Sequence, residues 1–323
     1  MFNVLGLPKV RENSTDVAVL EHLSKEHEVI PYILAYREKS KLVSTYLKPF
    51  LEKQINGVIY GRLNQLGSAS GRWSSADPNK QNIPTDADMR SLFIASPGCM
   101  LIDSDYSQIE GVVFAHCSQD PILLKTYREG GDIHTATSEK LGVPRKLAKV
   151  CNFAIIYGCF ENTLSENMKK EGFDYSKTDA RKFKDDFWKL YREGEKFVNG
   201  VKHSLHREGH VSTIFGRRRY FPEIFEADGV QRYAIEREAV NHVVQGTAAD
   251  ILKYAIVDVD AAFEITKLGN ILFPIQDEIL GEAEEGKAHE ALQIMERRMR
   301  DTKILSVPLL TEGKIGRNWA EVH

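Results

Sequence analysis

Two apolar segments that end in acids, far apart in the chain, restrict the fold of this sequence most strongly. Residues 99–105 (CMLIDSD) predict a buried strand that runs into carboxylates. Residues 271–283 predict a hairpin with Asp277 and Glu278 at its tip, and Pro274 places its first strand at an edge or weakens it. Mainly helical sequence separates the two. This pattern is typical of an α+β fold in which a small sheet carries the acids and a large helical insertion lies between its strands.

The remaining segments follow the same division. Apolar spacing predicts helices over residues 14–53, 107–116 and 234–263, and mainly helical structure over 134–205. Gly, Ser, Asn and Pro dominate residues 57–84, which predicts loops and short strands there.

Composition excludes several classes of protein. The chain has 323 residues, of which 42% are hydrophobic and 28% charged, as expected of a globular protein of one core or a few subdomains. Its apolar runs are far shorter than the roughly 20 residues of a membrane span, and its start does not resemble a secretion signal. We therefore expect a cytoplasmic protein with no membrane partner. The four cysteines form no CxxC pair, which favours reduced core residues.

Charge is distributed unevenly. The net charge of −3 argues weakly against a nucleic-acid partner. Lys and Arg nevertheless gather at 145–149 and 217–219, so a locally basic cleft is compatible with the sequence.

The acids themselves predict a metal site. Asp103 and Asp105 are two residues apart on a strand and so point to the same face, and Asp277 and Glu278 lie at the tip of the hairpin. Two strand ends could then converge on a cation, and oxygen ligands with open positions suit Mg²⁺. The alternative is that these acids are solvated turn residues. The acids alone do not decide between the two.

The segment 144–158 (PRKLAKVCNFAIIYG) is more informative. Pro144 suits a first helical turn and Gly158 suits the position after a helix end. Residues at 145, 149, 153 and 157 (Arg, Lys, Phe, Tyr) recur every four residues, which keeps them on one face with a drift of about 40° per step. Such a face could hold a triphosphate at its cationic end and stack a base at its aromatic end. The alternative is a solvated basic turn followed by two core aromatics.

A polar stripe marks the later helix. Arg237, Asn241 and Gln245 share the same four-residue spacing. Long donors suit the minor groove of a duplex, where every base pair presents an acceptor, so this stripe could bind DNA without reading its sequence. A solvent-facing stripe is the alternative, and Gly246 weakens the prediction of an unbroken helix.

Sequence blocks in a fixed order identify a family. They are SGRWSSADPNKQNIP at 70–84, DYSQIE at 105–110, RKLAKVCNFAIIYG at 145–158, ERxAxNxxxQGTAAD at 236–250 and QDE at 276–278. In these blocks the chain resembles the polymerase domain of family A DNA polymerases, which comprise the bacterial DNA polymerase I group and its phage and organellar relatives.

The resemblance implies a right-hand fold and an activity. Residues 1–66 would form a partial thumb, 67–125 the first part of the palm, 126–233 helical fingers and 234–323 the rest of the palm. The activity would be the addition of deoxynucleotides (dNTPs) to a primer 3′ end on primer-template DNA by a two-metal mechanism that uses Mg²⁺, with Mn²⁺ as a substitute.

The resemblance also implies roles for particular residues. Metal ligands would be Asp105, Asp277 and the carbonyl of Tyr106, and the catalytic set would be Asp105, Asp277, Glu278 and Lys149. Nucleotide contacts would come from Arg145, Lys149, Phe153, Tyr157, His134, Gln108 and Glu110. DNA contacts would come from Arg72, Asn82, Arg237, Asn241, Gln245 and Gln276.

Some positions imply finer properties. Phe153 matches the form of the family that discriminates against dideoxynucleotides, and Glu110 with Tyr157 matches the pair that excludes ribonucleotides. Gln276 stands where the family usually has His, which replaces a titratable ring with an amide that still donates and accepts. Only about 70 residues precede the first block. This is too few for a whole thumb or an exonuclease domain, and a fragment, a naturally split polymerase and an unusually small polymerase are the alternatives. We expect no proofreading exonuclease in this chain and a weak grip on DNA. A second polypeptide that supplies the missing thumb or exonuclease, or a processivity factor, is a candidate partner.

Two other functions are compatible with parts of the pattern. A binding subunit that has lost catalysis is disfavoured because both metal aspartates and both triphosphate cations are present. A single-subunit RNA polymerase is disfavoured by Glu110 and the DYSQIE block.

Overall fold

The computed structural model describes residues 2–8 and 14–323. These divide into two compact units, one made of Met1–Leu63 and Ser75–Ile83 and the other of Asn64–Ser74 and Pro84–His323. The short strands β3 (Arg62–Asn64) and β4 (Ser74–Ala76) lie where the chain passes between the units.

The first unit is mainly helical, as predicted for residues 14–53. It contains α1 (Phe2–Leu5), α2 (Val17–His22), a 3₁₀ turn (Leu23–Lys25), α3 (Val29–Lys41), a π-helical segment (Leu42–Leu47), α4 (Lys48–Lys53) and the hairpin of β1 (Gln54–Ile55) and β2 (Val58–Ile59). The Asp16 carboxylate accepts a hydrogen bond from the amide of Val19 and so caps α2. Leu20, Leu23 and Ile30 are fully buried and form the centre of a small core.

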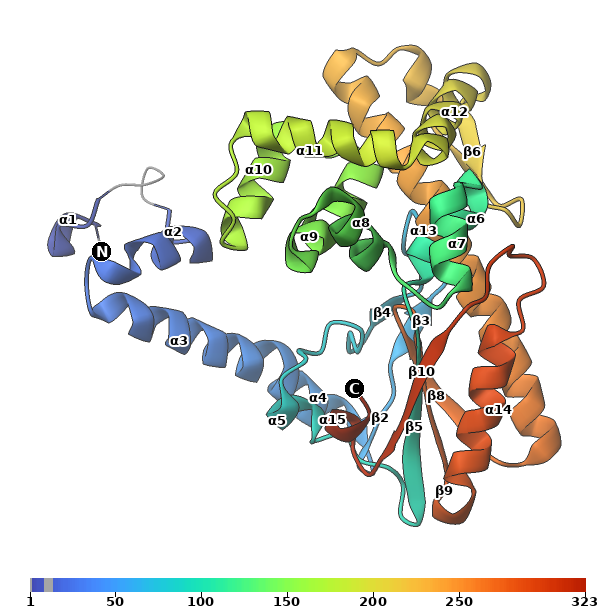
Figure 1. Ribbon diagram of the computed structural model, residues 1–323. Coiled ribbons are helices and arrows are strands. Elements are labelled where there is room, and N and C mark those ends of the chain that lie inside the picture. Colours follow the sequence, from blue (N-terminus) through green and yellow to red (C-terminus); the bar gives the residue numbers. More distant parts are fainter. Residues whose placement is uncertain (1, 9–13) are drawn as a thin grey trace. The chain divides into compact units, whose positions relative to one another are not determined.

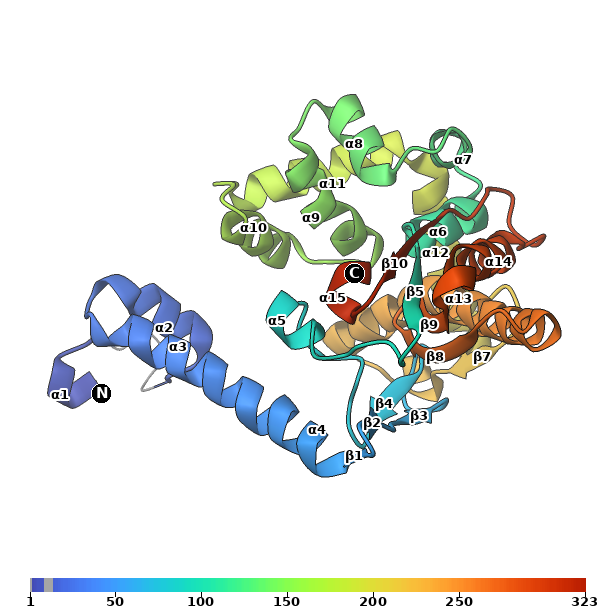
Figure 2. The ribbon, with the colours of Figure 1, turned by 90° about the horizontal axis from the view of Figure 1, so that it is seen from below.

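The second unit is built on a four-stranded antiparallel sheet in the order β10-β5-β9-β8 (Figure 1). The strands are β5 (Cys99–Tyr106), β8 (Asn270–Ile275), β9 (Glu278–Glu284) and β10 (Thr311–Gly316). The predicted strand and hairpin are thus confirmed, and Pro274 lies in β8 at the edge, where its missing N–H removes no inner ladder bond. The helices α13 (Gly229–Thr266) and α14 (Ala288–Arg300) pack against this sheet, as Figure 2 shows from below.

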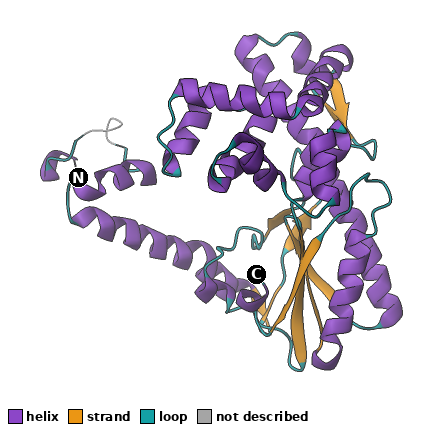
Figure 3. Ribbon diagram, viewed as in Figure 1, coloured by secondary structure: helices purple, strands orange, loops and turns teal. Residues whose placement is uncertain are grey.

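A large helical insertion separates β5 from β8 (Figure 3). It consists of α6 (Ile109–Ser118), α7 (Pro121–Arg128), α8 (Ile133–Leu141), α9 (Arg145–Ile156), α10 (Glu161–Lys170), α11 (Lys177–Leu190), α12 (Arg192–Glu208), the hairpin of β6 (His210–Ser212) and β7 (Arg218–Tyr220), a 3₁₀ turn (Pro222–Phe225), and α13. The helices begin at polar caps: Asp120 caps α7, Asp132 caps α8, and Ser176 with Asp179 forms a capping box on α11.

The short helices α5 (Ala87–Arg90) and α15 (Trp319–Val322) complete the second unit, together with a 3₁₀ turn (Glu285–Lys287). The core runs continuously from the insertion to the sheet, since Phe114, Tyr191 and Phe187 belong to the same buried cluster as Ile102 and Ile279. The sheet and the insertion therefore share one hydrophobic core.

Helix α13 is longer than predicted and unbroken. It begins after the cap residue Asp228 and continues through Gly246 to Thr266. A side chain at Gly246 would come within about 3 Å of Arg217 and Thr213, so the glycine permits close packing and does not interrupt the helix.

All four cysteines are free thiols, and two of them are buried while the other two are half-buried. Among the helices of the described residues, none has the length and apolar character needed to cross a membrane.

Candidate active site

The sheet brings the acids of the two predicted segments together. Strands β5 and β9 are neighbours, and Asp105 lies directly opposite Glu278. The amide of Tyr106 donates a hydrogen bond of 3.3 Å to the carbonyl of Asp277, which fixes the turn between β8 and β9 at the end of β5. Gln276, in that turn, has a φ of 53° and an exposed side chain. Asp105 and Asp277, from opposite ends of the insertion, thus meet at one end of the sheet.

The charges at this end of the sheet oppose one another. Partial loss of solvent, with the negative charges of Asp277 and Glu278, raises the pKa of Asp105 to about 7. Burial raises the pKa of Asp277 as well, although the nearby Arg72 opposes the effect. Carboxylates that repel each other at an accessible strand end fit a divalent cation, whose charge relieves the repulsion.

The donor set suits Mg²⁺ in particular. No group of three or more His, Cys, Asp or Glu side chains positioned to hold a metal occurs in the described part of the chain. The side chains of Asp105 and Asp277 would leave positions open for water and phosphate oxygens, which is how Mg²⁺ is commonly bound.

Glu278 does not lie at the tip of the hairpin, and that prediction is wrong. It is the first residue of β9 because the ladder with β5 extends to the Asp105–Glu278 pair, and its side chain is buried. One carboxylate oxygen lies 3.3 Å from Nδ1 of His323. Asp103 is also buried, and burial together with the charge of Glu278 raises its pKa. Of the two strand aspartates, only Asp105 has an exposed side chain.

A hydrogen-bonded network links the sheet to the end of α9. Arg72 donates to one carboxylate oxygen of Glu110 at 2.6 Å, and the hydroxyl of Tyr157 donates to the other. Gln245 of α13 lies beside the same hydroxyl. Since Arg72 also acts electrostatically on Asp277, the network runs from the acids at the sheet to the last residue of the α9 face.

The predicted face of α9 exists. Arg145 and Lys149 are exposed, and Phe153 and Tyr157 are half-buried with their rings stacked at 5.9 Å. The core side of the helix is formed by other residues: Leu147, Ala148, Cys151, Asn152, Ile155 and Ile156. Both aromatics pack against the hydrophobic core with part of their surface exposed, so the assignment of this face to a nucleotide stays a prediction. The helix begins after Pro144, one residue later than predicted, and Gly158 follows its end with a φ of 73°.

Helix α8 places two more groups beside the cationic end of α9. Its cap residue Asp132 accepts a hydrogen bond of 3.1 Å from Arg145. His134, in its first turn, is buried, and its ring meets Phe153 edge to face at 5.7 Å. Burial lowers the pKa of His134, and Arg145 and Lys149 add to this effect while Asp132 opposes it, which favours the neutral ring.

The polar stripe of α13 is half-buried: Arg237, Asn241 and Gln245 are each partly exposed. Arg237 donates to the carbonyl of Tyr157 at 3.1 Å, which ties α13 to the end of α9. Asn241 is half-buried, and its Oδ1 has no hydrogen-bond partner within the residues that the structure describes. The stripe is therefore neither fully solvated nor buried, and its contact with DNA stays a prediction.

Arg217 and Asp250 hold residues 70–72 in place and were not identified from the sequence. Arg217 donates to the carbonyl of Ser70 at 2.8 Å and to the buried carboxylate of Asp250 at 2.8 Å. Gly71, with a φ of 83°, lies so close to this guanidinium that a Cβ would meet it at 2.5 Å. Arg217 thereby places Arg72 next to Glu110. The signal was present in the basic run 217–219 and in the final Asp of the QGTAAD block.

Two predicted residues lie apart from this network. Gln108 precedes α6 with a φ of 55°, and its side-chain carbonyl is 3.5 Å from the hydroxyl of Tyr127. Asn82 belongs to the first unit, where its exposed side chain follows a carbonyl that accepts a hydrogen bond from Tyr46.

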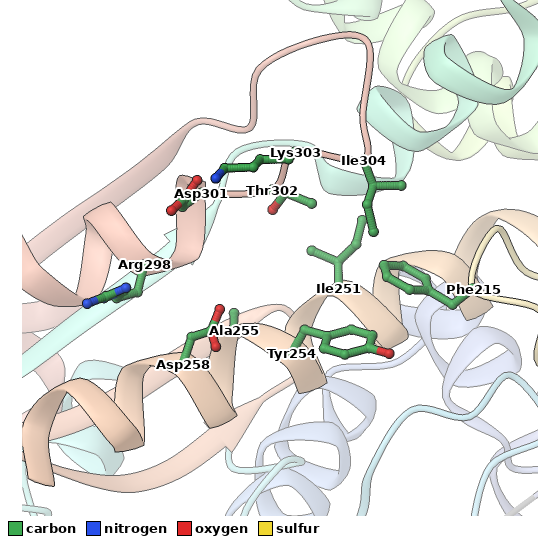
Figure 4. Close-up of a pocket in the computed structure, with 10 residues that line it drawn as sticks. All are labelled: Phe215, Ile251, Tyr254, Ala255, Asp258, Arg298, Asp301, Thr302, Lys303 and Ile304. Atoms are coloured by element: carbon green, nitrogen blue, oxygen red, sulfur yellow. The ribbon is translucent and has the colours of Figure 1, made fainter.

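A cavity of about 440 Å³ lies elsewhere in the second unit, between α13 and the segment after α14 (Figure 4). Phe215, Tyr254, Asp258 and Lys303 are among its lining residues, and none of the predicted site residues takes part. It is therefore separate from the candidate active site.

The sheet, the helical insertion and the acids at the sheet end define the polymerase domain fold of family A. The chain belongs to DNA polymerase family A, whose model matches residues 1–321. It is 37% identical to the thermostable DNA polymerase I of Thermus filiformis and to that of Thermus aquaticus, in each case over 99% of this chain and 40% of the relative. The chain thus spans less than half the length of these relatives.

A solved structure agrees with these sequence relatives. The chain superimposes with a TM-score of 0.89 and 30% identity on the POL domain of Pol1 from M. smegmatis in complex with DNA primer-template and dNTP, over 100% of this chain and 60% of that one. The predicted fold class and family are confirmed.

Proposed function

We propose that this chain catalyses the template-directed addition of deoxynucleotides to the 3′ end of a DNA primer. The observation that carries the proposal is the network from Asp105 and Asp277 through Arg72 and Glu110 to Tyr157. It joins a site suited to Mg²⁺ to a helix face suited to a nucleoside triphosphate. A nucleotidyl transferase needs both in one site, and a protein that only binds DNA has no chemical use for the acids.

In this proposal Asp105, Asp277 and the Tyr106 carbonyl hold the metal, and Glu278 supports them from β9. Two Mg²⁺ ions, when bound, would activate the primer 3′-hydroxyl and neutralise charge on the leaving pyrophosphate. Mn²⁺ would substitute for them.

The nucleotide would lie along α9. Arg145 and Lys149 would bind the triphosphate, with Lys149 near the leaving group, and His134 would add a further donor. Phe153 would pack on the base and sugar and so disfavour dideoxynucleotides. Gln108 would also contact the incoming nucleotide.

The DNA would be held mainly without sequence reading. Arg72, Arg237, Asn241 and Gln245 offer donors for the minor-groove acceptors that all base pairs present, and Asn82 and Gln276 would add contacts to template and primer. Residues 67–125 and 234–323 would then act as the palm, 126–233 as the fingers and 1–66 as part of the thumb.

The direct test is a primer-extension assay with the purified chain. We expect extension of a DNA primer on a DNA template with dNTPs and Mg²⁺, and far less with ribonucleotides. Parallel reactions with an RNA template establish the template preference. A chain that binds primer-template but extends no primer under any of these conditions would contradict the proposal.

Replacing Glu110 with alanine tests the predicted exclusion of ribonucleotides. The change removes the carboxylate held by Arg72 and Tyr157 and opens space beside the sugar. We expect discrimination between dNTP and rNTP, measured as the ratio of kcat/KM, to fall roughly 10²-fold. Exposed Glu166, replaced in the same way, is the control. Unchanged discrimination in the Glu110 variant would show that another residue excludes the 2′-hydroxyl.

Metal affinity should depend on pH. The carboxyl of Asp105, with its pKa raised to about 7, takes up a proton as the pH falls through neutrality, and the proton competes with the cation. We expect the dissociation constant for Mn²⁺, measured by electron paramagnetic resonance on the free chain, to rise up to about tenfold per pH unit below pH 7. The Asp105→Asn variant should lose this dependence. An affinity that is constant from pH 8 to pH 6 would contradict the prediction.

A further inference from the structure

Asn152 is a completely buried amide on the core side of α9, and it faces α8. Its Nδ2 lies 3.1 Å from the carbonyl of Ile133, 3.0 Å from the hydroxyl of Thr137 and 3.2 Å from Nδ1 of His134. Its Oδ1 is buried and has no hydrogen-bond partner in the described part of the chain. The amide therefore directs its donors to α8 and leaves its acceptor unused, although an unpaired buried oxygen is costly.

The neighbours of Asn152 determine which way the amide is turned. The carbonyl of Ile133 can only accept a hydrogen bond. The hydroxyl of Thr137 gives its hydrogen to that same carbonyl at 2.7 Å, so toward Asn152 it too is an acceptor. The side of the amide that faces α8 must therefore be the nitrogen. The two amide hydrogens face three acceptors, and Nδ1 of His134 is one of them, 3.2 Å from a nitrogen that can only donate. A hydrogen on Nδ1 would oppose that donor, so the contact favours the tautomer with its hydrogen on Nε2.

The surroundings of His134 fit a neutral ring with a free donor. The charged groups near it are Asp132 on its own helix and Arg145 and Lys149 on α9. Burial and the two cations lower its pKa, and Asp132 opposes them. Nε2 makes no hydrogen bond to any residue that the structure describes.

We propose that Asn152 is a positioning residue that holds His134 as the neutral tautomer with its hydrogen on Nε2, so that Nε2 donates to the triphosphate of the incoming nucleotide. The inference rests on the proposed function for the identity of that ligand. A neutral donor is suited to this place because a third cation beside Arg145 and Lys149 would be repelled by both. At neutral pH the hydrogen bond from Nε2 of His134 to the triphosphate then forms without protonation of the ring.

The tautomer can be observed without any activity, by ¹⁵N NMR of the imidazole nitrogens in the free chain, with His134→Gln identifying the signals. We expect Nε2 to carry the hydrogen at pH 7. In Asn152→Asp, which keeps the volume, the carboxylate should accept from Nδ1, move the hydrogen there and raise the pKa of His134. A ring with its hydrogen on Nδ1 in the unmodified chain, or a spectrum unaffected by Asn152→Asp, would overturn the proposal.

Kinetics separate positioning from a structural role. Asn152→Ala should raise the KM for dNTP about tenfold with little change in kcat, since one hydrogen bond to a charged group is lost. In a His134→Ala background the same change should raise KM less than about twofold, because the two residues act as a unit. Equal effects in both backgrounds would reduce Asn152 to a packing residue. Asn162→Ala, at an exposed position of α10, is the matched control.

The two arms fail in different ways. If the unmodified chain extends no primer, the proposed function fails, while the NMR result still supports or overturns the tautomer. If Asn152→Ala does not fold, Asn152→Asp carries the same double-mutant comparison. Binding of dNTP to the free chain, measured by calorimetry at a pH above the pKa of His134 in both proteins, should then weaken about tenfold in Asn152→Asp, because the neutral ring no longer carries its hydrogen on Nε2.

Discussion

Asp105→Asn is expected to lower the rate of primer extension by at least about 10³-fold while leaving the thermal unfolding midpoint unchanged or slightly higher. The substitution removes one of the two carboxylates proposed to bind the metal but keeps the size of the side chain. It also removes a negative charge that is repelled by Asp277 and Glu278, and the amide oxygen of Asn can still accept the hydrogen bond from the backbone of Tyr106. A loss of activity together with an undiminished midpoint distinguishes a metal ligand from a structural residue.

The matched control for this experiment is Asp174→Asn. Asp174 is fully exposed and forms only a long ion pair of 3.9 Å with Lys169, which contributes little to stability. Single-turnover rates and unfolding midpoints of the three proteins decide the matter. Asp105→Asn within about tenfold of the unmodified rate would contradict both the metal role and the proposed enzyme.

Arg217→Met is expected to lower the free energy of unfolding by about 3 kcal/mol, because it leaves Asp250 as a buried charge without its partner. The change also removes hydrogen bonds from the carbonyls of Ser70 and Gly246. The unfolding midpoint should fall by roughly 5–10 °C. Because Arg217 also holds the segment that carries Arg72, primer extension should decline even below that midpoint.

Arg218→Met is the matched control, since Arg218 is the neighbouring residue and its side chain is exposed. The double variant Arg217→Met, Asp250→Asn should recover part of the lost stability, because it removes the uncompensated charge. An Arg217 variant as stable as the Arg218 variant would show that the buried pair does not hold this segment.

Local sequence patterns determined the elements of the second unit well. The acid-ended strand, the hairpin with its proline at an edge, and the α9 face with Gly158 after its end all follow from short-range periodicity and backbone chemistry. These are properties of contiguous residues. The order of the longer sequence blocks carried the family resemblance, and the resemblance predicted the fold.

The sequence was less informative where contacts join distant segments. Glu278 lies in a strand because its cross-strand partner is Asp105, and Gly246 lies inside a helix because Arg217 packs against it. The residues adjacent to Glu278 and Gly246 in the sequence do not indicate that Asp105 and Arg217 are their contacts.

The two acids that restrict the fold were recognisable as strand-end carboxylates from the sequence alone, and so were the cations of α9. Only the tertiary structure decided that Asp105 and Asp277 share one end of the sheet, that Asp103 is buried beside Glu278, and that Asn152 faces His134. The reason is physical. The pKa of a group, the tautomer of a histidine and the geometry of a metal site depend on which side chains lie close together in space, and the folded structure alone determines those contacts.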